Sequence, residues 1–275
     1  MQLIKPSFEI LEQAPGIQGV KKQIERAGRT CYKSEDKITD TSCEEFVNRM
    51  VDSGHGAMLE HGTVYLQIPF KYIDVSSKLE IPIIEDLVFK YTENKYSQCV
   101  TINHVAYITT NYRVLVENGW LDDLQYQCEP TEYHEKRITV KFICDRGVSH
   151  EFVRHRVFSF AQESTRYCNY MKDKFGTSVS FIYPEWLQDS EYLEFEEDCR
   201  ILEIMYAKWI NKGWTAQQAR DFLPTGVKTE LIMTGFALDW LHFFQLRCHS
   251  TAHPQARELA IPLKEEFIKK GFING

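Results

Sequence analysis

Residues 149–170 read SHEFVRHRVFSFAQESTRYCNY, and this stretch concentrates positive charge in an otherwise acidic chain. Its cations are Arg154, His155, Arg156 and Arg166. A guanidinium binds phosphate through two parallel hydrogen bonds, so several converging guanidiniums form an anion site. Phenylalanine and valine residues interleave the run, which predicts that the run is at least partly buried. Buried arginines without carboxylates need an anionic ligand. The alternative interpretation is a solvated basic surface.

A second basic set follows in the C-terminal third. Arg220 lies in ARDFLP, Lys228 comes shortly after it, and Arg247 ends the apolar segment FALDWLHFFQLR. An arginine at the end of a helix can also simply complement the helix dipole. Together with the first run, this set indicates a pocket for a charged planar ligand.

Composition excludes several classes of protein. The chain has 275 residues, which suggests one large domain or two small ones. Hydrophobic residues make up 43% and charged residues 26%, as in globular proteins. The net charge of −7 disfavours a nucleic-acid partner, and no apolar run is long enough for a membrane span. With an acidic N-terminal stretch and eight cysteines but no C-x-x-C pair, we expect reduced thiols and a cytoplasmic location.

The apolar pattern predicts an α+β fold, with a small antiparallel sheet flanked by helices, a helix-rich C-terminal part and an inserted subdomain. The expected strands are residues 63–68, 138–143 and 178–183. The expected helices are one from a Ser42/Glu45 capping box to Gly54, then residues 103–118 before Gly119, 190–212 before Gly213, one from Thr215/Gln218 to Pro224, and 254–270 with a kink at Pro262. Residues 229–246 are apolar on most sides, which predicts a buried segment in this helix-rich part. We expect a single domain over residues 1–275, with an insertion at about 71–137.

Several familiar motifs are absent or wrongly spaced. There is no phosphate-binding G-x-x-x-x-G-K-[ST] loop, no G-x-G-x-x-G turn and no G-x-S-x-G elbow. His150 and His155 resemble a zinc-protease pair, but five residues on a helix set them ~140° apart, too far to share a metal. His55, Glu60 and His61 form a looser cluster, more typical of histidines that hydrogen-bond around a turn. We therefore predict no metal site.

The chain resembles the flavin-dependent thymidylate synthases. Their signature is Arg-His-Arg, seven residues and then Ser, which matches Arg154 to Arg156 and Ser164, followed by the usual Thr-Arg-Tyr. GRTCYKS (28–34), GHGAMLEH (54–61), ARDFLP (219–224) and the Leu246-Arg247 segment follow in the family's order. The resemblance covers most of the chain except residues about 71–137.

This resemblance implies reductive methylation of dUMP to dTMP in de novo dTMP biosynthesis. Methylenetetrahydrofolate would supply the carbon, NADPH-reduced FAD the hydride, and no protein nucleophile is needed. It implies a homotetramer whose active sites lie at subunit interfaces. FAD contacts would come from Ala57, Glu60, Arg154, His155, Arg156, Gln162 and His242. Contacts to dUMP would come from Glu151, Arg154, Gln162, Glu163, Ser164, Thr165, Arg166, Arg220 and Arg247. Arg247 would be catalytic, as the cation that stabilises the ionised pyrimidine ring.

Two positions depart from the family pattern. The family often has Asn-x-Arg where this chain has Phe236-Ala237-Leu238, and we hypothesise that Asn111-Tyr112-Arg113 substitutes in space. A usual histidine is Thr251 here, flanked by His249 and His253. Two alternatives stay open: a non-catalytic nucleotide-binding protein of the same fold, and a metal-dependent nucleotide hydrolase that uses His55, His61 and His150.

Overall fold

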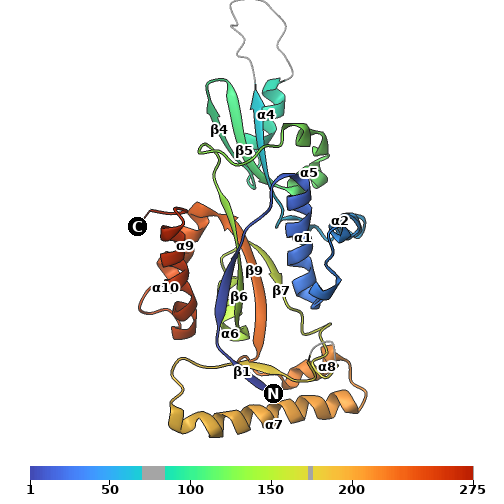
Figure 1. Ribbon diagram of the computed structural model, residues 1–275, viewed down its shortest axis with the longest axis vertical. Helices are drawn as coiled ribbons and strands as arrows, with labels where there is room; N and C mark the ends of the chain where they lie inside the picture. Colours follow the sequence, from blue (N-terminus) through green and yellow to red (C-terminus); the bar gives the residue numbers. More distant parts are fainter. Residues whose placement is uncertain (70–83, 173–175, 275) are drawn as a thin grey trace, which may run out of the picture. The chain divides into compact units, whose positions relative to one another are not determined.

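The computed structural model describes residues 1–69, 84–172 and 176–274 (Figure 1). These residues form two compact units. Unit 1 comprises Met1–Leu11, Ala27–Lys37 and the chain from Thr139 onward, and unit 2 comprises Glu12–Arg26 and Ile38–Ile138. Residues 71–83 of the predicted insertion lie outside the described residues, and the prediction of one domain with an insertion stays a prediction.

Unit 1 is built on a four-stranded sheet in the order β2-β6-β9-β7. Its strands are β2 (Ser7–Leu11), β6 (Arg137–Asp145), β9 (Lys228–Phe236) and β7 (Ser159–Gln162). The β2–β6 and β7–β9 pairs are antiparallel. Two short strands, β1 (Gln2–Ile4) and β8 (Ser180–Ile182), form a separate parallel pair. With the helices below, this sheet confirms the predicted α+β class.

Helices surround the strands of unit 1. They are α6 (Arg146–Phe152), α7 (Tyr192–Asn211), α8 (Ala216–Ala219), α9 (Ala237–Arg247) and α10 (Pro254–Lys269), with 3₁₀ turns at Asp189–Glu191 and Arg220–Phe222. Helices α9 and α10, orange to red in Figure 1, pack against each other. Phe142 of β6 contacts Phe152 of α6 at 5.0 Å between ring centroids, and Phe158 contacts Trp240 of α9 at 4.7 Å. This aromatic core fixes α6 and α9, which carry predicted site residues.

Unit 2 contains an antiparallel three-stranded sheet in the order β3-β5-β4. Its strands are β3 (Thr63–Pro69), β4 (Gln98–Ile102) and β5 (Val105–Asn111). Its helices are α2 (Ser42–Asp52), α3 (Gly56–Leu59), α4 (Ile84–Thr92) and α5 (Tyr112–Asn118), with a 3₁₀ turn at Leu121–Tyr126. The 3₁₀ turn at Glu35–Lys37 belongs to unit 1. Helix α1 (Gly16–Tyr32) contributes residues to both units. Val64, Leu66 and Ile68 are fully buried, as their alternation predicted.

A predicted helix, residues 103–118, and the predicted buried segment, residues 229–246, are each partly strand. Residues 105–111 form β5, and only 112–118 are helical before the left-handed Gly119. Residues 228–236 form β9, and the helix α9 begins only at Ala237. Strand β9 lies between β6 and β7 and its interior is buried on both faces, so its side chains do not alternate between apolar and polar. The burial predicted for residues 229–246 is confirmed for 229–235, but it is wrong for one side of α9, where Leu238, Leu241 and Leu246 are exposed.

Helix boundaries agree closely with prediction elsewhere, with one exception. Ser42 is the first residue of α2 and not its cap: Thr41 occupies the cap position without a side-chain hydrogen bond, and the Ser42 hydroxyl donates to the Glu25 carboxylate at 2.9 Å. The predicted Thr215/Gln218 capping box is present, and α10 continues through Pro262 to Lys269.

Two further findings concern the cysteines and the helices of the described residues. No pair of cysteines in the described ranges forms a disulfide. None of the described helices combines the length and the apolar character needed to cross a membrane.

Candidate active site

The signature residues Arg154, His155 and Arg156 lie in the turn between α6 and β7. Helix α6 begins at a fixed position because the Asp145 carboxylate accepts a hydrogen bond from the backbone N–H of Val148 at 2.8 Å. The turn leaves the two arginines exposed, whereas His155 is only 6% exposed.

The run is partly buried, as predicted, since His155 and two phenylalanines are buried, but the inference that its arginines are buried is wrong. Phe152 and Phe158 on either side of the turn fill the aromatic core, so the apolar residues of the run are accounted for without the guanidiniums. Val157, which interleaves the run, is itself 66% exposed. The turn therefore presents its arginines to solvent or to a ligand.

Arg247, the last residue of α9, is held by two residues of the signature region. Its Nε donates to His155 Nε2 at 3.0 Å. Its Nη1 donates to Glu151 Oε2 at 2.5 Å, and its Nη2 donates to the Glu151 carbonyl oxygen at 2.7 Å. Three sequence-predicted residues thus form one hydrogen-bonded cluster, with the Arg247 side chain 14% exposed.

His155 is a neutral hydrogen-bond acceptor in this cluster. A guanidinium can only donate, so the lone pair lies on His155 Nε2 and the ring proton on Nδ1. Burial and, to a smaller extent, the charges of Arg247 and His242 together lower the pKa of His155 from 6.5 to about 4. The exposed His242 ring lies 5.9 Å from that of His155.

Arg247 is a poorly hydrated cation. Burial lowers the pKa of Arg247, the Glu151 carboxylate opposes that shift, and the nearby Arg154 adds to it. An anionic ligand beside Arg247 would relieve this unfavourable electrostatic environment.

The second half of the signature begins where β7 ends. Gln162 Nε2 donates to Ser149 Oγ at 2.8 Å and to Thr229 Oγ1 at 3.3 Å. Arg166 is exposed, and its Nε donates to Gln217 Oε1 of α8 at 3.0 Å. Gln217 is followed closely by Arg220, so the structure brings the Arg166 and Arg220 segments together.

The backbone between Gln162 and Arg166 is anchored. The Ser164 N–H donates to the Cys31 carbonyl oxygen at 3.0 Å, Ser164 is half-buried, and Thr165 is buried. Arg220 is exposed at the start of a 3₁₀ turn.

Several of these guanidiniums lack a protein anion. Within the described parts of the chain, the guanidinium groups of Arg154, Arg156 and Arg220 make no ion pair or hydrogen bond. Exposed guanidiniums free of carboxylates fit recognition of phosphate groups.

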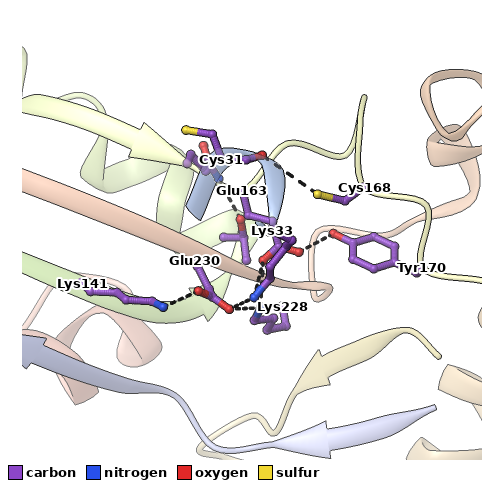
Figure 2. Close-up of polar contacts among 10 residues, drawn as sticks. Cys31, Lys33, Lys141, Glu163, Cys168, Tyr170, Lys228 and Glu230 are labelled. Carbon is purple, nitrogen blue, oxygen red and sulfur yellow. Dashed lines mark hydrogen bonds and ion pairs between the residues drawn. The ribbon is translucent and has the colours of Figure 1, made fainter. Parts of the chain in front are cut away.

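Glu163, within the signature, belongs to a buried ionic network (Figure 2). Glu163 accepts from Tyr170 at 2.9 Å and from Lys228 at 2.8 Å. Glu230 pairs with Lys33, with Lys228 at 2.5 Å and with Lys141 at 2.5 Å. Sequence reasoning noted Lys228 and Glu163 but missed the other members, although Lys228 and Glu230 share one face of a strand.

Two predicted flavin contacts, Ala57 and Glu60, belong to unit 2. Ala57 is exposed. Arg113 Nη1 pairs with Glu60 Oε1 at 2.5 Å, and Arg137 Nη1 donates to the Glu60 carbonyl oxygen at 3.0 Å. A Cβ on Gly56 would lie 2.7 Å from Arg113 Nε, so Arg113 approaches the GHGAMLEH backbone closely. Arg113 therefore lies beside a predicted flavin contact.

The positions that depart from the family pattern have local roles. Phe236 is the residue before α9, and Leu238 is 63% exposed. His249 Nδ1 and Thr251 Oγ1 are 2.8 Å apart. His253 precedes α10, and its ring lies 5.8 Å from that of Trp186.

The histidines of the hydrolase alternative differ in burial. His61 is fully buried, whereas His55 and His150 are exposed. Among the described residues, no three His, Cys, Asp or Glu side chains group in a way that could hold a metal ion.

Comparison with known proteins matches residues 88–270 to the family model of the thymidylate synthase complementing proteins (Thy1). The chain is 33% identical over 133 residues to the flavin-dependent thymidylate synthase of Pyrococcus furiosus, covering 47% of this chain and 53% of that protein. The enzyme of the same name from Pyrococcus horikoshii is 35% identical over 129 residues, covering 46% and 52%. The chain spans about half the length of these curated relatives.

Among solved structures, the chain is similar to the UMP/dUMP methylase PolB from Streptomyces cacaoi bound with 5-Br UMP. The TM-score is 0.45 at 14% identity, over 98% of this chain and 92% of that chain. This likeness is too distant to carry an argument. The family match spans about two thirds of the sequence, and it includes the whole of the signature and Arg247. The chain therefore belongs to the thymidylate synthase complementing protein family.

Proposed function

We propose that this chain catalyses the reductive methylation of dUMP to dTMP. Methylenetetrahydrofolate is the carbon donor, and FAD reduced by NADPH is the hydride source. Family membership supports the reaction class. The observation that carries the proposal is the environment of Arg247. This half-buried cation is held by His155 and Glu151, beside guanidiniums that have no carboxylate partner among the described residues.

Arg247 has hydrogen-bonding capacity left for a ligand. A guanidinium carries five N–H donors, and His155, the Glu151 carboxylate and the Glu151 carbonyl take three of them. In the described structure, one N–H on each terminal nitrogen remains for the carbonyl oxygens of a pyrimidine ring. A fixed cation there stabilises the negative charge that develops on the ring, and the neutral His155 adds no competing positive charge.

The other residues divide into nucleotide and flavin contacts. Ser164, Thr165, Arg166 and Arg220 would hold the phosphate and sugar of dUMP, with Glu151, Arg154 and Gln162 completing that pocket. Arg154, His155, Arg156, Gln162 and His242 would contact FAD, together with Ala57 and Glu60. The exposed, unpaired guanidiniums of Arg154 and Arg156 suit the diphosphate of FAD. When bound, FAD supplies the hydride chemistry that no side chain can provide.

The cysteines support a mechanism without a protein nucleophile. Burial raises the pKa of Cys168 to about 12 and that of Cys31 to about 11, so neither thiol ionises readily. We expect Cys168→Ala and Cys248→Ala variants to keep wild-type turnover. Loss of activity in either variant with an intact fold and bound flavin would point to thiol catalysis.

The proposal includes a cytoplasmic homotetramer with shared active sites. Leu238, Leu241 and Leu246 of α9 are 63%, 37% and 48% exposed, which is typical of a surface that another subunit covers. Sedimentation equilibrium of the FAD-loaded protein tests this, and a monomer at micromolar concentration would contradict it.

The decisive experiment is a visible absorption spectrum of the FAD-reconstituted protein. The protein is titrated anaerobically with NADPH and then given dUMP and methylenetetrahydrofolate. We expect bleaching, followed by recovery of the flavin absorbance and dTMP formation only when both substrates are present. A protein that binds flavin and dUMP but never forms dTMP would support the non-catalytic alternative. A colourless protein would return attention to metal-dependent hydrolysis.

A further inference from the structure

Glu163 belongs to the signature, yet its side chain turns away from solvent. Its carboxylate is 0% exposed. One oxygen accepts from the Tyr170 hydroxyl at 2.9 Å, and the other pairs with Lys228 at 2.8 Å and lies 3.8 Å from Lys33 (Figure 2). Because protein partners occupy both oxygens, Glu163 is not arranged to contact a nucleotide directly.

The main chain beside Glu163 is held by the same elements as its side chain. The Glu163 N–H donates to the Glu230 carbonyl oxygen of β9 at 2.9 Å, and the Ser164 N–H donates to the Cys31 carbonyl oxygen at 3.0 Å. Lys228 and Glu230 lie on β9, while Cys31 and Lys33 lie at the end of α1. Two hydrogen bonds and two ion pairs therefore fix this short segment between a central strand and a helix end.

Lys33 occupies a backbone conformation that normally favours glycine. Its φ is +48°, directly after α1, and the Ser34 N–H donates to the Arg29 carbonyl oxygen at 3.1 Å as in a glycine-terminated helix. A lysine there is conformationally less favourable than a glycine. The ammonium group offsets this by pairing with Glu230 and approaching Glu163, contacts that glycine would lose.

The network carries one excess positive charge. Lys33, Lys141 and Lys228 face two carboxylates, Glu163 and Glu230. The pKa of Lys228 is lowered to about 8, mainly because the group is buried. The charge of Lys33 also lowers this pKa, whereas Glu163 raises it. Loss of the Glu163 charge would leave three buried or half-buried ammonium groups around one carboxylate, an unfavourable arrangement that must relax by moving the segment or losing a proton.

We propose that Glu163 is a positioning residue: through Lys33, Lys228 and Tyr170 it fixes the Ser164–Arg166 segment in the conformation that binds the phosphate and sugar of the nucleotide. This inference rests on the proposed function. It gives Glu163 a role different from the direct dUMP contact that the family resemblance implies.

The test compares Glu163→Ala and Glu163→Gln with the control Glu197→Gln, a 65%-exposed carboxylate on α7. In the FAD-loaded protein, we expect Glu163→Ala to raise the KM for dUMP at least tenfold, while kcat at saturation changes less than threefold. Hydrogen exchange of the peptide that contains Ser164 should accelerate by a similar factor. The control should match wild type in all three measurements. If Glu163→Ala does not fold, Glu163→Gln replaces it, because the amide keeps the volume and loses only the charge.

A double variant separates charge balance from a direct contact. Glu163→Gln raises the excess charge of the network from one to two, and adding Lys228→Met returns it to one. We expect the double variant to recover most of the dUMP affinity that Glu163→Gln loses. An unchanged KM for Glu163→Ala, a fall in kcat with unchanged KM, or no recovery in the double variant would each overturn the positioning role. Failure of the proposed function would look different, because the wild-type protein itself would then not bind dUMP.

Discussion

Acidification should destabilise this protein through His155 in particular. The ring is 6% exposed, its Nε2 accepts from Arg247, and its pKa is about 4 in place of 6.5. The His155 ring therefore binds a proton below pH 6.5 in the unfolded chain, but only below about pH 4 in the folded chain. Above 6.5 neither state carries this proton, so the destabilisation appears only as the pH falls through that window.

The size of the effect follows from the shift. Each unit of pKa difference corresponds to about 1.4 kcal/mol, so the full shift is worth about 3 kcal/mol below pH 4. Between about pH 7.5 and about pH 5, where the folded ring is still mostly neutral, the expected loss in the free energy of unfolding is about 2 kcal/mol.

Urea unfolding of wild type and a His155→Asn variant measures this loss. Asparagine retains an acceptor for Arg247 but cannot titrate. The stability difference between the two proteins should change by about 2 kcal/mol over that pH range, in the direction that favours the variant in acid. The exposed His249→Asn variant serves as the control and should follow wild type. A constant difference between wild type and His155→Asn across the range would refute the reasoning.

Three further predictions test the site and the core. Arg247→Ala should lower kcat by about 10²–10³ while the protein stays folded and yellow, as expected for a lost charge-stabilising donor, and wild-type turnover would contradict the assignment. Arg113 pairs with Glu60, a predicted flavin contact, so Arg113→Ala should weaken FAD binding about tenfold. Fluorescence titration measures this affinity, and an unchanged value would contradict the hypothesis that Arg113 helps to bind FAD. Gly235→Ala should reduce the free energy of unfolding by about 1–3 kcal/mol, because its Cβ would lie 2.5 Å from the ring of Phe158, and urea unfolding would show this loss.

Local patterns predicted much of the fold. The alternation of Val64, Leu66 and Ile68 located β3, and Gly119 and Gly213 marked the helix ends, where both adopt positive φ. Strand β9 could not be recognised in the same way. A strand buried on both faces reads as a continuous apolar run, which periodicity alone does not separate from a buried helix.

The residues of the candidate site were also only partly predictable from the sequence. The sequence indicated the basic residues of the site because they cluster in an acidic chain and match the order of a known family motif. They are Arg154, His155, Arg156 and Arg247. The partnership of Lys33, Lys141 and Glu230 was not found, since it depends on which strands and helix ends become neighbours. A sequence pattern reports the spacing along one element, whereas ion pairs such as Lys33–Glu230 join residues far apart in the chain.

The buried network of three lysines and two glutamates also restricts which substitutions the sequence can accept. Replacing either glutamate raises the excess positive charge from one to two in a buried setting, whereas replacing one lysine balances the charges and removes its ion pairs. Saturation mutagenesis should therefore find Glu163 and Glu230 individually intolerant, whereas a neutral replacement of either survives when one lysine of the network is neutralised as well. Such epistasis would make the loss of a glutamate depend on the loss of a lysine, so that substitutions at these positions occur in pairs.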